Sequence, residues 1–215
     1  MEFKLDDASP LRSDDERYEF VRKLGEGGSG VVHLVRDCET GEQLAWKRLQ
    51  RTDEHSIARL KREFRTLSTI NHKNVIRLYD LGRSRDEWFL TMEYLDGPTL
   101  LDYLDGASVS NTQQRNVTNN GVDAIDLARI MSVFHQLATG IAALHQRGVL
   151  HRDLKPSNVI VERGRVVVLD FGLALTVGDA ATTVTMDGAI AGTPAYMAPE
   201  QLQGTDWGEP NDWYS

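Results

Sequence analysis

The alternation of apolar and polar positions predicts strands in the first part of the chain. Segments 18–24, 31–37 and 42–49 are rich in β-branched and aromatic residues, and short turns separate them. Segments 74–81 and 87–95 have the same character. Together these five segments predict an antiparallel sheet.

A spacing of three and four between apolar residues predicts two helices. One apolar stripe consists of Ile57, Leu60, Phe64, Leu67 and Ile70. The other begins after Asp123, a candidate N-cap, and consists of Ile130, Val133, Phe134, Leu137, Ile141 and Leu144. Two short strands, 159–162 and 165–170, follow the second helix, and from Gly172 onward the pattern predicts loop.

This order of elements predicts an α+β fold with two lobes. An antiparallel sheet and one helix make up the first lobe, residues 18–95, and a mainly helical lobe follows in residues 96–215. Residues 1–17 are polar and acidic and are predicted to form a flexible leader. Residues 105–121 are rich in Asn, Ser, Thr and Gln and are predicted to form an exposed insertion loop.

The composition excludes several functions. The chain has 215 residues, of which 40% are hydrophobic and 26% charged, with a formal net charge of −8. This charge argues against binding to nucleic acid or anionic lipid as the main activity. A single cysteine, Cys38, excludes an internal disulfide framework. We find neither a signal peptide nor an apolar run of membrane-spanning length, so a cytoplasmic location without a membrane segment is expected.

The glycine-rich stretch LGEGGSGVV is the first candidate for ligand binding. Gly25, Gly27 and Gly30 have the spacing of a phosphate-binding loop, in which the backbone approaches a polyphosphate closely. A dinucleotide site requires a helix after the glycines, whereas a strand follows here. The spacing therefore favours a flap over a nucleotide, and a plain hairpin turn is the alternative.

Lys47 is the second candidate. In a strand, Ala45 and Lys47 share one face while Trp46 and Arg48 take the other. A small Ala beside a Lys suits a flat base with phosphates near the ammonium group, although a solvated lysine is the alternative. Glu63, on the predicted helix, could hold the Lys47 ammonium in place.

Two acidic residues end apolar segments in the second half of the chain. Asp153 lies in HRDLKPSN (151–158), between the apolar runs GVL and VIV, and Asp170 ends the run RVVVLD. Their similar placement predicts one shared polar site.

These motifs occur together in the order and approximate spacing of eukaryotic-type (Hanks-type) protein kinases, which the chain resembles over residues 18–215. The motifs are the three glycines with Val32, the strand Lys47, Glu63, HRDLKPSN, DFG at 170–172 and APE at 198–200. The sequence AYMAPEQ is similar to that of bacterial members of the family.

The resemblance implies ATP and Mg²⁺ as the ligands and assigns roles to the residues that match. Asp153 would be the base, Lys155 would neutralise charge on the transferred phosphoryl group, and Lys47 with Glu63 would hold the other phosphates. Asn158 and Asp170 would hold Mg²⁺. The nucleotide-binding residues would be Leu24, Gly25, Glu26, Gly27, Gly28, Gly30, Val32, Ala45, Lys47, Glu93, Leu95 and Ile160.

The same resemblance implies protein Ser/Thr hydroxyls as substrates. Lys155, two places after the base, and Thr193 in GTPAYMAPEQ match serine/threonine kinases. In the activation segment, 170–200, one threonine of ATTVT (Thr182, Thr183 or Thr185) is a candidate for autophosphorylation in trans, with Arg152 binding the phosphate. The alternative is that ATTVT is only a flexible polar loop.

The chain departs from the family pattern at its end, where NDWYS resembles the start of a central helix with further helices expected after it. Glu200 normally pairs with an arginine from that region, and no arginine follows Arg165. We therefore expect an incomplete C-lobe with exposed apolar patches. Two other functions compete: an ATP-binding pseudokinase or regulatory fragment, and a small-molecule kinase, against which GTPAYMAPE argues.

Overall fold

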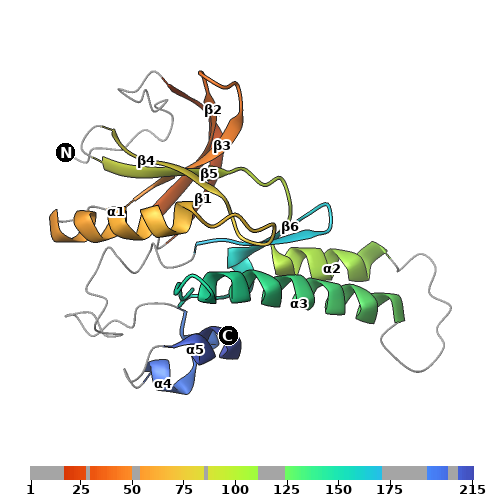
Figure 1. Ribbon diagram of the computed structural model, residues 1–215. Helices are drawn as coiled ribbons and strands as arrows, with labels where there is room; N and C mark the ends of the chain where they lie inside the picture. The colour runs from red at the N-terminus through yellow and green to blue at the C-terminus, as the bar shows by residue number, and fades with distance from the viewer. Residues whose placement is uncertain are drawn as a thin grey trace, which may run out of the picture. The chain divides into compact units, whose positions relative to one another are not determined.

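A computed structural model describes most of the chain (Figure 1). The described residues are 17–27, 30–49, 54–84, 87–110, 124–170, 193–202 and 208–215. They divide into two compact units. The first includes the described residues up to 52 and Leu78–Tyr94, and the second includes Asp53–Arg77 and the chain from Leu95 on. The lobe boundary near residue 95 stays a prediction.

In the first unit, the described residues form a five-stranded antiparallel sheet in the order β1-β2-β3-β5-β4. Its strands are β1 (Tyr18–Gly27), β2 (Gly30–Asp37), β3 (Gln43–Arg48), β4 (Leu78–Ser84) and β5 (Glu87–Glu93). The predicted sheet is thus confirmed. The limits of two strands differ most: β1 continues to Gly27, and β4 runs from Leu78 to Ser84, so that residues 74–77 instead form a loop.

An apolar cluster holds one face of this sheet together. It consists of Tyr18, Val35, Leu44, Trp46 and Phe89, which are buried. The Trp46 and Phe89 rings stack with centroids 5.1 Å apart. Alternation along the strands brings these side chains to one face, as the period of two predicts.

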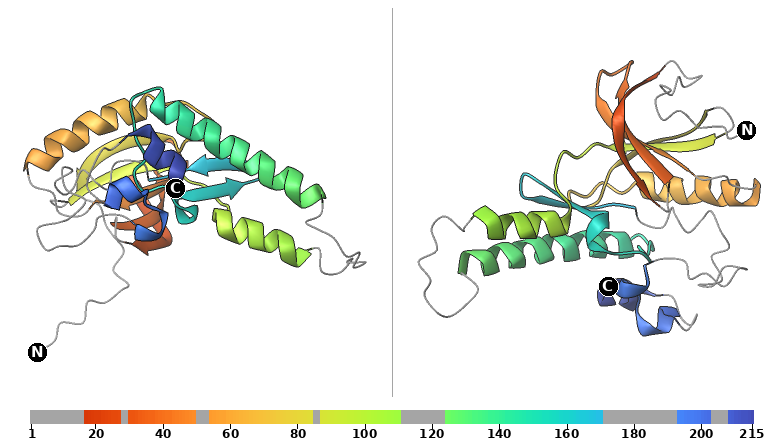
Figure 2. Two further views of the ribbon diagram at one scale, coloured as in Figure 1. Left: turned by 90° about the horizontal axis from the view of Figure 1, so that it is seen from below. Right: turned by 180° about the vertical axis from the view of Figure 1, so that it is seen from behind.

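The second unit contains the helices and one two-stranded sheet. Its elements are α1 (Glu54–Ser68), α2 (Leu100–Ser110), α3 (Ala124–His145), the 3₁₀ helix η1 (Pro156–Asn158), β6 (Val159–Glu162), β7 (Arg165–Val168), the 3₁₀ helix η3 (Pro194–Tyr196), α4 (Pro199–Leu202) and α5 (Glu209–Tyr214). Figure 2 shows α2 and α3 side by side. The Arg129 guanidinium of α3 lies 3.8 Å from the centre of the Tyr103 ring of α2.

Three expectations for this unit were wrong. Helix α2 continues to Ser110 and so includes part of the predicted loop 105–121. The end of the chain is not all loop, because α4 and α5 form there. Phe134 is 53% exposed, although Val133, Ile141 and Leu144 of the same predicted stripe are buried. Phe134 lies on nearly the same side of α3 as the buried Ile141, two turns further on, so its exposure reflects less cover toward the N-terminal part of the helix, where Leu127 and Met131 are exposed as well.

Apolar side chains are exposed at several places among the described residues of this unit. On α3 they include Leu127 (55%) and Met131 (64%), and on α5 Trp213 (51%) and Tyr214 (61%). The stretch Leu127–His145 is long and apolar enough to cross a membrane by composition alone. A core helix passes the same test, and α3 packs against β7 through its buried residues.

Candidate active site

Asp153 lies within a small network of polar side chains. Lys155 Nζ donates to Asp153 Oδ2 over 2.7 Å and to Thr193 Oγ1 over 2.8 Å. Thr193 Oγ1 donates in turn to Asp153 Oδ1 over 3.2 Å. Both Asp153 and Lys155 keep about a quarter of their side-chain surface exposed. A carboxylate held on both oxygens yet open to solvent is oriented for contact with a ligand.

Asn158 and Asp170 are neighbours because a hairpin joins the segments that carry them. Strands β6 and β7 pair with Val159 opposite Val168, and the Leu169 N–H donates to the Asn158 carbonyl over 2.8 Å, which extends the pairing by one residue. Asp170 follows directly. Its φ of 56° lies in the left-handed region, which is costly for a non-glycine residue. Such strain is common at functional sites.

These residues fit a magnesium ion. The Asn158 side-chain NH₂ donates to the Asp153 carbonyl over 2.8 Å, which leaves the amide oxygen as the group able to ligate a cation. With the Asp170 carboxylate this gives hard oxygen donors, the type that Mg²⁺ prefers. Among the described residues, no cluster of three or more His, Cys, Asp or Glu side chains forms a ready-made metal site. One or two protein ligands are the usual number for Mg²⁺ bound with phosphates.

His151 joins the loop of Asp153 to the segment of Asp170. It is fully buried; its Nδ1 accepts from the Asp153 N–H over 3.3 Å, and its Nε2 lies 2.8 Å from the Leu169 carbonyl oxygen. This arrangement requires a neutral ring with the proton on Nε2. Burial lowers the pKa of His151, although the nearby Asp212 acts in the opposite direction. The ring therefore stays neutral and keeps both contacts.

Asp212 of α5 holds the same loop through hydrogen bonds to its backbone. Its carboxylate accepts the N–H groups of His151 (2.7 Å) and Arg152 (2.8 Å) and lies 2.8 Å from His145 Nε2. Asp212 is 3% exposed. Sequence reasoning identified Asp212 only as part of a helix start and gave His145 no role. The one signal in the sequence that could have identified Asp212 was an acidic residue next to the large apolar side chain of Trp213.

Glu200 has a partner that the sequence did not predict. The Asn211 side-chain NH₂ donates to Glu200 Oε1 over 3.0 Å, from α5 to α4. An amide from within the chain thus contacts the carboxylate for which an arginine was expected.

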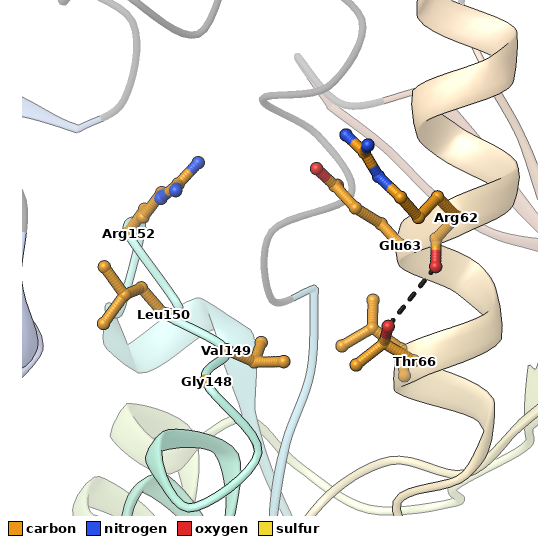
Figure 3. Close-up of a pocket in the computed structure, with 8 residues that line it drawn as sticks. Arg62, Glu63, Thr66, Gly148, Val149, Leu150 and Arg152 are labelled. Carbon is orange, nitrogen blue, oxygen red and sulfur yellow. Dashed lines mark hydrogen bonds between the residues drawn. The ribbon is translucent and has the colours of Figure 1, made fainter.

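Glu63 lines a cavity of about 220 Å³ between α1 and the loop 148–152, which leads to Asp153 (Figure 3). Figure 3 shows the Glu63 and Arg152 side chains extending toward each other across it. Arg62 and Leu67 of α1 and Leu150 of the loop also line the cavity. The expected pairing of Glu63 with Lys47 stays a prediction.

The candidate nucleotide residues of the sheet unit share one face. Val32 pairs with Lys47, and Ala45 lies two residues from Lys47 on β3, so the three side chains point the same way. Lys47 is 3% exposed, which excludes a solvated lysine. The predicted partition of β3 is therefore correct, since Trp46 packs on the opposite face.

The glycines of β1 and β2 have two different roles. A Cβ on Gly30, whose φ is 123°, would lie 2.1 Å from the Arg48 carbonyl oxygen, so only glycine fits there. A Cβ on Gly25 or Gly27 would meet nothing within 4 Å, which leaves their backbone open to a ligand. Both lie in β1, which is longer than predicted.

The other candidate residues lie in both units. Leu24 and Glu26 are on β1 and Glu93 ends β5, whereas Leu95 and Ile160 belong to the second unit. Gly28 lies outside the described residues, as do the leader up to residue 16, residues 111–121 of the predicted insertion and Thr182, Thr183 and Thr185.

Comparison with known proteins defines the family. Residues 18–215 match the family model described as protein kinase domain, and the chain belongs to this family. It is 37% identical to serine/threonine-protein kinase pkn2 of Myxococcus xanthus over 94% of this chain, and 32% identical to PrkC of Bacillus subtilis over 87%. The chain spans only 23% and 27% of these two relatives. The predicted resemblance to bacterial members of the eukaryotic-type family is confirmed.

Solved structures confirm the fold. Two mutant forms of the Mycobacterium tuberculosis PknI kinase domain match with TM-scores of 0.64 and 0.66, at 23% and 24% identity. Each match covers 95% of this chain and 71% or 73% of the solved chain. The predicted α+β kinase fold is therefore correct.

Proposed function

We propose that the chain is an ATP-dependent kinase that phosphorylates Ser or Thr hydroxyls of proteins. One observation carries the proposal: the Asp153 carboxylate is held by Lys155 and Thr193 while remaining partly exposed. A base for a substrate hydroxyl needs this combination of fixed orientation and access. The relatives named as serine/threonine kinases support the substrate class.

In this proposal the residues position reactants and neutralise charge. Asp153 accepts or orients the hydroxyl proton, and the Lys155 ammonium, already 2.7 Å from it, faces the charge that develops on the phosphoryl group. Asn158 and Asp170 would hold Mg²⁺, which neutralises phosphate charge when bound. Lys47 and Glu63, with the open backbone of Gly25 and Gly27, would bind the triphosphate.

The proposal extends to regulation and location. Phosphorylation of Thr182, Thr183 or Thr185 in trans would supply a phosphate for the Arg152 guanidinium. A cytoplasmic location is proposed because ATP is available there. The proposed partners are protein substrates, and no nucleic-acid partner is proposed.

The test is label transfer from γ-labelled ATP with Mg²⁺ to a generic Ser/Thr protein substrate. Asp153→Asn is expected to reduce transfer by about 10²–10⁴-fold while nucleotide binding stays unchanged. Asp105→Asn, a change at an exposed carboxylate on α2, is the matched control and should transfer like the wild type. Nucleotide binding without transfer by the wild type would indicate a pseudokinase. Label on small molecules alone would indicate a small-molecule kinase.

A further inference from the structure

Strand β7, which leads into Asp170, is paired on both edges. Strand β6 lies along one edge, and the loop after α1 lies along the other. The Val168 N–H donates to the Asn74 carbonyl and the Ile76 N–H donates to the Val168 carbonyl, both over 3.0 Å. Asp170 is two residues beyond Val168, so this pairing is the last one on that edge before the acid.

The hairpin itself sets the register of β6 with β7. Arg163 and Gly164, with φ of 51° and 82°, form its two-residue turn. A slip by two residues would also move Arg165 or Asp170 into a position that a fully buried valine now holds. The hairpin alone does not determine how its second edge is held within the unit, so other contacts must hold β7 there.

Asn74 supplies one part of the answer. It is fully buried, and its side-chain NH₂ donates to the Val166 carbonyl over 2.7 Å and to Gln136 Oε1 over 3.1 Å. These contacts attach the second edge of β7 to the loop after α1 and to α3.

Helix α3 supplies the rest from one face, on which Thr139 and Gly140 lie three and four residues after Gln136. Gln136 Oε1 also accepts the Val166 N–H over 3.2 Å, and its NH₂ donates to the Gly164 carbonyl over 3.0 Å. A Cβ on Gly140 would lie 2.7 Å from the Asn74 carbonyl oxygen, so the close approach requires glycine there. Thr139 Oγ1 lies 3.3 Å from Asn74 Oδ1.

We propose that Asn74 and Gln136 are positioning residues for the metal-binding end of β7: they hold the second edge of the strand in place and thereby set where the Asp170 carboxylate lies. This rests on the proposed function for the role of Asp170. Neither residue is among the candidate ligand-binding residues. The loss of either is expected to weaken Mg²⁺ binding, as changes to residues that support metal ligands commonly do by about 10–100-fold.

The test compares Gln136→Met, which keeps the size of the side chain but removes its hydrogen bonds, with Gln146→Met at an exposed glutamine. A fluorescent ATP analogue is titrated with and without Mg²⁺. Gln136→Met is expected to raise the Mg²⁺ concentration for half-maximal binding about tenfold. Its affinity without Mg²⁺ should match the wild type, and so should both values for Gln146→Met.

Amide hydrogen exchange provides a readout that needs no ligand. Peptides covering 165–170 should exchange faster in Gln136→Met, while peptides covering β3 should not change. If Gln136→Met fails to fold, Thr139→Val, which removes only a hydroxyl, is expected to show the same exchange effect at smaller size. Two results would overturn the proposal: unchanged exchange at 165–170 in the variants, or an unchanged Mg²⁺ requirement in Gln136→Met when nucleotide binding by the wild type does depend on Mg²⁺. A wild type whose nucleotide binding ignores Mg²⁺ would instead count against the proposed function.

Discussion

The interiors of the two units contain different kinds of buried groups. In the sheet, the interior is an apolar cluster in which Trp46 stacks on Phe89. In the second unit, the loops of the candidate site are held by buried polar side chains, above all His151, Asp212 and Asn74. Apolar packing is non-directional and tolerates small shifts, whereas each hydrogen bond specifies one partner atom. The sheet therefore provides stability, and the polar groups provide position.

The largest expected effect comes from the sheet. Phe89→Ala should lower the free energy of unfolding by about 3–5 kcal/mol, because it removes a ring that is 1% exposed and leaves a cavity beside Trp46. Urea unfolding measures this value, and Phe89→Leu should cost less. Hydrogen exchange should rise in β3 and β5 and stay unchanged at 151–153. A rise of equal size in both places would contradict the distinction between the units.

The second effect concerns the loop that carries Asp153. Asp212→Asn keeps the shape of the side chain but replaces one of the oxygens that now accept N–H groups of His151 and Arg152. A loss of about 1–3 kcal/mol in unfolding free energy is expected, since a buried donor is left unsatisfied. Exchange at 151–153 should rise and phosphoryl transfer should fall by more than in Phe89→Leu. Transfer equal to the wild type would show that Asp212 does not position the loop.

The smallest effect is a dependence on pH that the units share. Burial lowers the pKa of His33 in the sheet and of His151 in the site below the ordinary value of 6.5. The folded state thus favours the neutral rings, so their contribution is fully present above about pH 6.5 and is lost as the pH falls. Each histidine can contribute at most about 1.4 kcal/mol per pH unit.

His33→Phe isolates the share of the sheet. His33 lies between the rings of Phe20 (5.1 Å) and Trp46 (5.9 Å), where a phenyl ring can replace the imidazole. Between pH 7 and pH 5, the variant should lose less unfolding free energy than the wild type in urea titrations. Equal losses would assign the acid sensitivity to His151 and other groups.

Much of the site could be predicted because the motifs are local. The alternation around Lys47 predicted the strand and its faces, and the polar break HRDLKPSN, with the acid that ends RVVVLD, predicted a shared polar site for Asp153 and Asp170. The limits of the strands were less predictable. Residues 74–77 have strand composition, yet they form a loop because their backbone pairs with β7, which lies about 90 residues further along the chain.

The sequence by itself determined the family, the apolar faces and the identity of the acids, since each depends on residue type and short spacing. Only the tertiary structure decided which buried polar groups hold those acids in place. Asp212, His145, Asn74 and Gln136 are far in sequence from the residues that they hold, and nothing in their local context identifies the partner. A hydrogen bond depends on atoms brought within about 3 Å, and a one-dimensional pattern does not carry that distance.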